Sequence, residues 1–309
     1  MLLAGFDAGQ TTTRCRIVEL TGDHWHERAT GLGPGVCHLE AANGTERFQA
    51  AIRTSSANAG SIGSLDAAVI GASGIERGTP LEERASRLMA HALDLAPERA
   101  LATGDERTAL RGAFPEQPGI VAISGTGMIC VGRNGEGMEH RCGGWGWQLD
   151  GAGAAFDLGH QGLQLSLRMA DGRLPDHPLR EELWTLLGCS SSVELKALVV
   201  SPEFRAAQFA ALAPAVVAAA ENGLEEARGI VDRSAAAQAE SIKSVAVALE
   251  LGHPQVVGQG GAFEHLLPFR NAVRGALSEM LPEAQWCDPT GDACDGALHL
   301  ARDLVIRPR

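Results

Sequence analysis

The chain has 309 residues, of which 45% are hydrophobic and 21% are charged, and its formal net charge is -12. This length exceeds the usual size of one hydrophobic core, so two folded domains are expected. An acidic chain lacks the basic face that neutralises nucleic-acid phosphates, and no apolar run approaches the ~20 residues of a membrane-spanning helix. We therefore predict no nucleic-acid partner, no membrane span and, because no basic leader precedes Asp7, a cytoplasmic location.

The first part of the chain alternates between strand and helix patterns. Thr79 and Glu82 form a capping box with Pro80 at the first helical position, which predicts a helix with one apolar face. A glycine- and threonine-rich turn at 7–13 separates the first two strands. The predicted strands are 2–6, 14–20, 25–30, 65–72 and 100–103, and the predicted helices are 45–57 and 80–95.

A proline-bearing connector at 115–118 marks a domain boundary, after which the strand, turn and strand pattern starts again. This recurrence indicates an internal duplication. We predict an N-terminal domain at 1–114 and a C-terminal domain at 115–291, with a last helix at about 292–309 that packs back on the first domain. The predicted strands are 119–124, 128–133, 255–258 and 284–287, and the predicted helices are 151–170, 202–221, 225–251, 263–280 and 292–304.

Three glycine-rich loops, at 7–14, 123–128 and 256–263, are candidates for binding the phosphates and the ring of a nucleotide. Glycines let a phosphate approach the backbone closely, and threonine hydroxyls supply directed donors. Each loop alone also fits an ordinary turn. Asp7 could hold magnesium through water, because Mg²⁺ keeps most of its hydration shell and needs one or two carboxylates. The candidate nucleotide contacts are Gly9, Gln10, Thr11, Thr12, Thr13, Gly125, Thr126, Gly127, Gly260 and Gly261.

Taken in order, these loops resemble the phosphate-one, phosphate-two and adenosine motifs of the actin-like ATPase superfamily, over nearly the whole chain. Four further strings resemble the N-acetylglucosamine kinase branch of the BadF/BadG/BcrA/BcrD ATPase family: Gly143-Gly144-Trp145-Gly146, His160-Gln161, Gly291-Asp292 and Gly296-Ala297-Leu298. That branch also includes glucosamine kinases and the activating ATPases of radical enzymes. The resemblance implies an α/β fold of two actin-like ATPase (ribonuclease H-like) domains with a nucleotide cleft between them, ATP and Mg²⁺ as cofactors, and a homodimer.

The resemblance also implies a carbohydrate kinase that phosphorylates N-acetylglucosamine or glucosamine, with Asp105 as the catalytic base. An alcohol is a poor nucleophile, and a carboxylate within hydrogen-bond reach orients it and accepts its proton. The alternative role for Asp105 is to cap a helix beginning at Glu106. The implied sugar contacts are Gly74, Asp105, Gly144, Trp145, Gly146 and Asp150.

The chain departs from the family pattern in its sugar-binding loops. Residues 150–153 read Asp-Gly-Ala-Gly where the family usually has Gly-Asp-Glu-Gly, and the asparagine expected near 33–36 is absent. The identity of the sugar therefore stays open. Trp145 either stacks on a sugar or fills a hinge, and His160 is expected to be an ordinary helix residue.

Two other functions remain. An ATP-driven activator would carry cysteines for an iron–sulfur cluster, and the seven scattered cysteines, expected to be reduced, do not supply an obvious set. A non-catalytic sugar sensor on the same fold is the third hypothesis.

Overall fold

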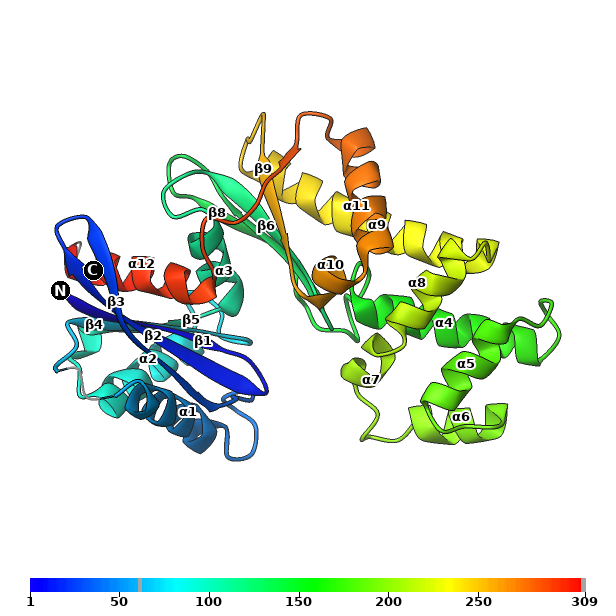
Figure 1. The fold of residues 1–309 in the computed structure, drawn as a ribbon, viewed down its shortest axis with the longest axis horizontal. Coiled ribbons are helices and arrows are strands. Elements are labelled where there is room, and N and C mark those ends of the chain that lie inside the picture. Colours follow the sequence, from blue (N-terminus) through cyan, green and yellow to red (C-terminus); the bar gives the residue numbers. More distant parts are fainter. Residues whose placement is uncertain (61–62, 307–309) are drawn as a thin grey trace. The chain divides into compact units, whose positions relative to one another are not determined.

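A computed structural model describes residues 1–60 and 63–306 of the chain. The chain divides into two compact units, Met1–Pro118 with Asp288–Arg309, and Gly119–Cys287. Each unit contains one five-stranded sheet flanked by helices (Figure 1), so the predicted α/β class is confirmed. Residues 307–309 of the predicted C-terminal helix lie outside the described residues.

The sheet of the first unit combines an antiparallel meander with parallel strands. Its order is β3-β2-β1-β4-β5, in which β1 pairs antiparallel with β2 and parallel with β4, and β4 pairs parallel with β5. Parallel strands end at the same edge of a sheet, so the loops that follow β1, β4 and β5 share one edge. The strands are β1 Leu2–Ala8, β2 Thr12–Thr21, β3 His24–Pro34, β4 Ala67–Ala72 and β5 Ala100–Thr103.

Both faces of this sheet are covered, because successive strand residues point to opposite sides. Phe6 and Ile70 pack with α1 and α2, whereas Leu3 and Val69 pack with α12. Figure 1 shows α1 and α2 on one side of the sheet and α12 and α3 on the other. The Thr79 half of the predicted capping box is confirmed, since the Thr79 hydroxyl accepts the Glu82 N–H, whereas the Glu82 carboxylate accepts the Gly78 N–H instead of the Thr79 N–H. The helices are α1 Gly44–Asn58, α2 Pro80–Leu93, α3 Asp105–Ala113 and α12 Ala293–Ile306, with a 3-10 turn at Pro97–Arg99.

The second unit repeats the same sheet order. Its strands are arranged β10-β9-β6-β7-β8, with β6, β7 and β8 antiparallel and with β9 and β10 parallel to β6. The order therefore matches that of the first sheet strand for strand, as the repeated sequence pattern indicates. The strands are β6 Gly119–Ser124, β7 Met128–Arg133, β8 Glu139–Gly143, β9 Gln255–Gln259 and β10 Gln285–Trp286.

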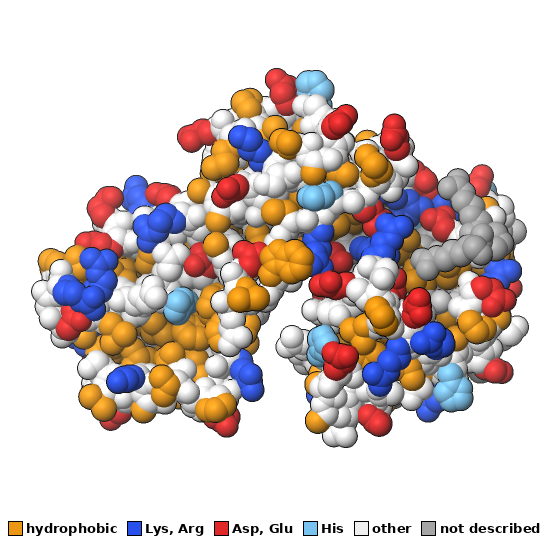
Figure 2. All heavy atoms as spheres, turned by 180° about the vertical axis from the view of Figure 1, so that it is seen from behind, with side chains coloured by type: hydrophobic (Ala, Val, Ile, Leu, Met, Phe, Trp, Pro, Cys, Tyr) orange, Lys and Arg blue, Asp and Glu red, His pale blue; other side chains and the backbone are white. Residues whose placement is uncertain are grey.

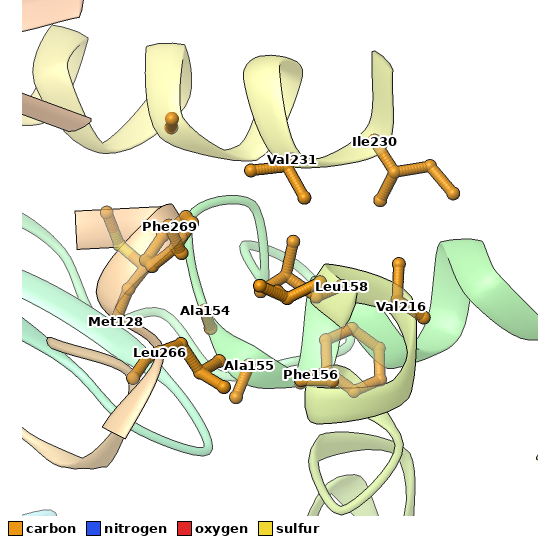
Figure 3. Close-up of a cluster of buried hydrophobic side chains, with 14 of the residues drawn as sticks. Met128, Ala154, Ala155, Phe156, Leu158, Val216, Ile230, Val231, Leu266 and Phe269 are labelled. Carbon is orange, nitrogen blue, oxygen red and sulfur yellow. The ribbon is translucent and has the colours of Figure 1, made fainter. Parts of the chain in front are cut away.

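The helices of the second unit enclose one large hydrophobic core. Helix α9 packs on β6, β7 and β8, and α8 and α11 pack on α9. Figure 3 shows Val231 and Ile230 of α9 opposite Leu158 of α4, with Met128 and Phe269 in the same cluster. The helices are α4 Ala155–Ala170, α5 Pro178–Leu186, α6 Ser192–Val199, α7 Ala206–Ala210, α8 Ala213–Glu221, α9 Glu225–Ala248, α10 Gly261–His265 and α11 Leu267–Met280.

Two predicted helices are each divided in the structure. The segment predicted at 202–221 forms α7 and α8, and that at 263–280 forms α10 and α11. Pro214 and Pro268 lie in the first turns of α8 and α11, where a missing N–H is tolerated. Each proline therefore marks the start of a separate helix, whereas the prediction has one continuous helix. The helix predicted from residue 151 begins at Ala155, because Gly153 adopts a positive φ of 88°. Strand β8 and helices α5 and α6 were not predicted.

Within residues 1–60 and 63–306, no helix combines the length and apolarity that crossing a bilayer requires. On the face drawn in Figure 2, acidic and basic side chains of the described residues are intermixed. No broad basic surface gathers there.

Candidate functional site

The first phosphate-loop candidate is the hairpin between β1 and β2. Gly9, Gln10, Thr11 and Thr12 are exposed, and the Gly9 N–H donates to the Thr12 carbonyl at 3.0 Å. By contrast, Thr13 is fully buried, and its hydroxyl donates to the Pro34 carbonyl at 2.8 Å. The Thr13 side chain therefore supports the hairpin from within, and the exposed side chains belong to residues 10–12.

The chain that follows β3 is bonded directly to this hairpin. The Gly35 N–H donates to the Thr11 carbonyl at 3.0 Å, and the Val36 N–H donates to the Gly9 carbonyl at 2.9 Å. A β-carbon on Gly35 would overlap the Gln10 backbone. Only glycine permits so close an approach, which holds the loop in one conformation.

Asp7, the candidate magnesium residue, is held by an ion pair. Arg14 Nη2 lies 2.8 Å from Asp7 Oδ2, and Arg14 Nη1 lies 3.4 Å from Asp292 Oδ2. Arg16 also pairs with Asp292, at 3.0 Å, and with Asp295 in α12. The start of α12 is therefore joined to the strand that leaves the first phosphate loop.

Asp105 is at the start of α3, directly after β5, on the edge that also carries the end of β1. The helix cap is Gly104, and the N–H of Glu106 donates to Asp105 Oδ1 at 3.1 Å. Burial raises the pKa of the Asp105 carboxyl, hydrogen bonding to Glu106 opposes this shift, and the charge of Asp7 adds to it. Asp105 is thus a half-buried carboxylate close to Asp7, and it occupies the first helical position instead of the cap.

A buried polar group lies below Asp105. Arg107, one turn into α3, donates to the Thr103 hydroxyl at 2.7 Å and lies 3.7 Å from Glu82 of α2. Glu82 in turn accepts the N–H of Gly78 at 2.8 Å. Because both charges are buried and paired, they stabilise the junction between β5 and α3 only as long as both are present.

The second phosphate-loop candidate, between β6 and β7, is open to solvent. A β-carbon built on Gly125 or on Gly127 would meet no heavy atom within 4 Å. Both glycines and Thr126 between them lie at the tip of the hairpin, where Gly125 N–H donates to the Gly127 carbonyl at 2.9 Å. The space that side chains would fill is available to an anion.

Two other predicted loops of the second unit converge on this hairpin. The Ser124 hydroxyl donates to the Gly153 carbonyl at 2.7 Å, and the Ala155 N–H donates to the Gly125 carbonyl at 2.9 Å. Gly260, which has a positive φ of 94°, lies so close that a β-carbon there would be 2.6 Å from the Ser124 carbonyl. The second phosphate loop, the adenosine loop and the 150–153 loop are therefore one assembly centred on Ser124 and Gly125.

The Gly143-Gly144-Trp145-Gly146 string forms the turn after β8. Its three glycines all have positive φ, between 78° and 89°. A β-carbon on Gly143 would contact the sulfur of Met128 and, at 3.5 Å, Asp150 Oδ2. Trp145 is 61% exposed, with the Arg141 guanidinium 4.6 Å from the centre of its ring. The turn thus places Asp150 beside the second phosphate loop and presents the tryptophan to solvent.

The His160 ring packs against other aromatic rings, and the cysteines form no disulfide and no metal-binding group among the described residues. The His160 ring stacks on Phe156 at 5.3 Å and meets Phe209 edge-on at 5.3 Å. All seven cysteines are free. Among the described residues, no three His, Cys, Asp or Glu side chains gather as a metal-binding group, so a magnesium ion at Asp7 would need ligands from water and from a bound nucleotide.

The predicted site residues thus form two groups. In the first unit, Asp7, residues 9–12, Gly74 and Asp105 share the edge at which β1, β4 and β5 end. In the second unit, Gly260 and the Gly153 carbonyl lie against Ser124 at the base of residues 125–127, and Asp150 lies beside Gly143. Sequence reasoning missed Ser124 and Arg14 as site residues. Both lie within the predicted loops 7–14 and 123–128, but the sequence does not show which side chains of a loop turn inward.

Comparisons with known proteins show which family the chain resembles. Residues 4–301 match the BadF/BadG/BcrA/BcrD ATPase family. The N-acetylmuramic acid/N-acetylglucosamine kinase of Clostridium acetobutylicum is 27% identical over 206 residues, which span 66% of this chain and 67% of that protein. The N-acetyl-D-glucosamine kinase of Dictyostelium discoideum is 30% identical over 187 residues, 59% of each chain. The crystal structure of a candidate N-acetylglucosamine kinase from Chromobacterium violaceum is 26% identical, with a TM-score of 0.74, over 97% of this chain and 98% of that one.

Proposed function

Because the chain belongs to the BadF/BadG/BcrA/BcrD ATPase family, we propose that it is an ATP-dependent kinase for an amino sugar. The substrate is N-acetylglucosamine or glucosamine, and the product is the 6-phosphate. The observation that carries this proposal is Asp105, a half-buried carboxylate with a raised pKa, next to Asp7 at the edge that also bears the first phosphate loop. The kinases that the chain resembles support the choice of sugar.

Asp105 orients the attacking hydroxyl and accepts its proton. As the hydroxyl oxygen bonds to the γ-phosphorus, the bond from that phosphorus to the bridging oxygen breaks, and ADP leaves. A carboxylate whose pKa is raised holds the proton more readily than an ordinary aspartate, which suits a base acting late in phosphoryl transfer. The Glu106 N–H on Asp105 Oδ1 fixes the orientation of the carboxylate.

Residues 9–12 of the first unit and residues 125–127 of the second unit are each proposed to bind phosphate oxygens. Thr11, Thr12 and Thr126 are exposed, and a β-carbon on Gly125 or Gly127 would meet no heavy atom within 4 Å, which leaves room for an anion beside that backbone. Gly260 and Gly261 present bare backbone to the nucleoside. Mg²⁺, held at Asp7 through water, would neutralise charge that develops on the phosphates.

Arg14 must release Asp7, at least in part, for this metal position to form. The 2.8 Å ion pair with Arg14 neutralises the charge of Asp7. An exposed pair of this kind contributes little to stability, so its exchange for a magnesium ion and phosphates costs little.

A coupled assay of ADP release tests the proposal. Wild-type chain with MgATP should release ADP only when a sugar is added, and N-acetylglucosamine or glucosamine should exceed neutral sugars. Asp105→Ala should lose at least a hundredfold in kcat while its affinity for a nonhydrolysable ATP analogue stays within about threefold. A wild-type kcat in this variant would contradict the assignment of Asp105 as the catalytic base.

We also propose a homodimer, on the family resemblance. Light scattering should then give twice the chain mass of 32.3 kDa. A measured mass equal to that of one chain would contradict the proposed dimer but not the proposed kinase activity.

A further inference from the structure

His38 is an exposed histidine on the same edge of the first unit, and its position is set by the core on both sides. Val36 and Leu39 are each only 5% exposed and pack into the cluster that contains Phe6 and Ile70. The His38 carbonyl accepts the Ala41 N–H at 2.9 Å, which closes a turn before α1. The segment therefore holds His38 on a fixed backbone.

Two neighbours of His38 belong to the predicted site. Two residues before it, the Val36 N–H bonds the first phosphate loop at Gly9. Its ring lies against Gly74, so that a β-carbon there would be 2.8 Å from His38 Cδ2 and 3.3 Å from Nε2. Gly74 follows β4, and Asp105 follows the adjacent parallel strand β5, so His38 is at the edge where the catalytic carboxylate lies.

The hydrogen bonding of the ring indicates which nitrogen carries the proton. The Glu40 N–H donates to His38 Nδ1 at 3.3 Å. A nitrogen that accepts a hydrogen bond carries no proton in the neutral ring, so the proton is on Nε2. Nε2–H is then a donor at the Gly74 side of the ring, and the complementary group is an oxygen with a free lone pair.

We infer that His38 is a specificity residue that donates Nε2–H to a hydroxyl oxygen of the acceptor sugar. This inference rests on the proposed sugar-kinase function. Gly74 has a positive φ of 82°, which favours glycine, and a β-carbon there would also meet the His38 ring.

Substitutions of His38 separate sugar binding from nucleotide binding. His38→Leu should raise the KM for the sugar about five- to tenfold, the usual loss for one neutral hydrogen bond, with KM for ATP unchanged. His38→Gln, whose amide can donate, should recover at least half of the lost affinity. His91→Ala, at an exposed histidine of α2 in the same unit, is the matched control and should behave as wild type.

A spectroscopic measurement tests the donor independently of turnover. Long-range ¹H–¹⁵N correlation at pH 8, with the His38 signals assigned by their loss in His38→Gln, should show the proton on Nε2. A proton on Nδ1, or a sugar KM within twofold of wild type in His38→Leu, would overturn the role of His38 alone. A wild-type chain that phosphorylates no sugar would overturn the proposed function and this role together.

Discussion

Asp105, the proposed catalytic base, carries a cost to stability. Its pKa is raised in the folded chain by burial and by Asp7, so the unfolded chain loses the proton at lower pH than the folded chain does. Stability therefore falls as pH rises through the interval between these two values, and the full cost is present above the raised value.

Asp105→Asn should consequently stabilise the chain while it abolishes turnover. The amide keeps an oxygen to accept the Glu106 N–H but carries no charge. The melting temperature at pH 7.5, without nucleotide or magnesium, should exceed that of wild type by a few degrees, at roughly 2–4 °C per kcal/mol. The gain should shrink as pH falls below the raised pKa of Asp105, because the folded wild-type chain is then also uncharged at this position. A variant that is less stable at every pH would contradict the assignment.

Substitution of Gly125 by alanine distinguishes a steric clash with the ligand from a loss of folding stability. Since a β-carbon there meets nothing within 4 Å and φ is not positive, Gly125→Ala should leave the melting temperature of the free chain within about 1 °C. The added methyl group should nevertheless weaken binding of a magnesium–ATP analogue at least tenfold, as measured by calorimetry. Gly135→Ala, at another open glycine of the same unit, should bind normally. Equal affinities of the two variants for the magnesium–ATP analogue would contradict the proposed role of residues 125–127 in binding phosphate.

Helix α12 packs closely against α3 and against the core of the first unit. Gly296 lies against α3 so closely that a β-carbon would overlap the Thr108 carbonyl. The first-unit core includes Leu298 and Ala301 of the same helix. The last helix of the chain is thus part of the layer that supports the catalytic edge.

Gly296→Ala should destabilise the chain by about 1–3 kcal/mol, the usual cost of overpacking a tight contact. Gly275→Ala, in the middle of α11 with open space around it, should instead raise stability by up to about 1 kcal/mol. Urea titrations followed by circular dichroism measure both. Gly296→Ala as stable as wild type would contradict the close docking of α12 on α3.

Local signals predicted most elements but not how they divide. The two Gly/Thr hairpins and the Thr79 cap were predicted, because alternation and capping act over a few residues. The breaks before Pro214 and Pro268 were missed, since proline in a first turn is compatible with a helix and the sequence does not show where the preceding helix ends. Strand β8 is short and amphipathic, and it depends on pairing with β7.

The sequence predicted which loops form the proposed site, but it did not predict the contacts between their residues. The three glycine clusters and Asp105 were found from the sequence, whereas the roles of Ser124 and of His38 depend on which strands become neighbours. Thr13 shows the opposite case, because its hydroxyl turns inward to Pro34.

At the scale of the whole molecule, the two units share one strand order and belong to one family of ATPases. Each half of the chain has a Gly/Thr hairpin between the first two strands of its sheet, and the proposed base, Asp105, follows the last strand of the first sheet.

Transfer of labelled phosphate tests the kinase activity most directly. With [γ-³²P]ATP, magnesium and N-acetylglucosamine or glucosamine, chromatography should show the label in a sugar phosphate, at a rate abolished in Asp105→Ala. Label found only in inorganic phosphate, or retained entirely in ATP with every amino sugar, would contradict a sugar kinase.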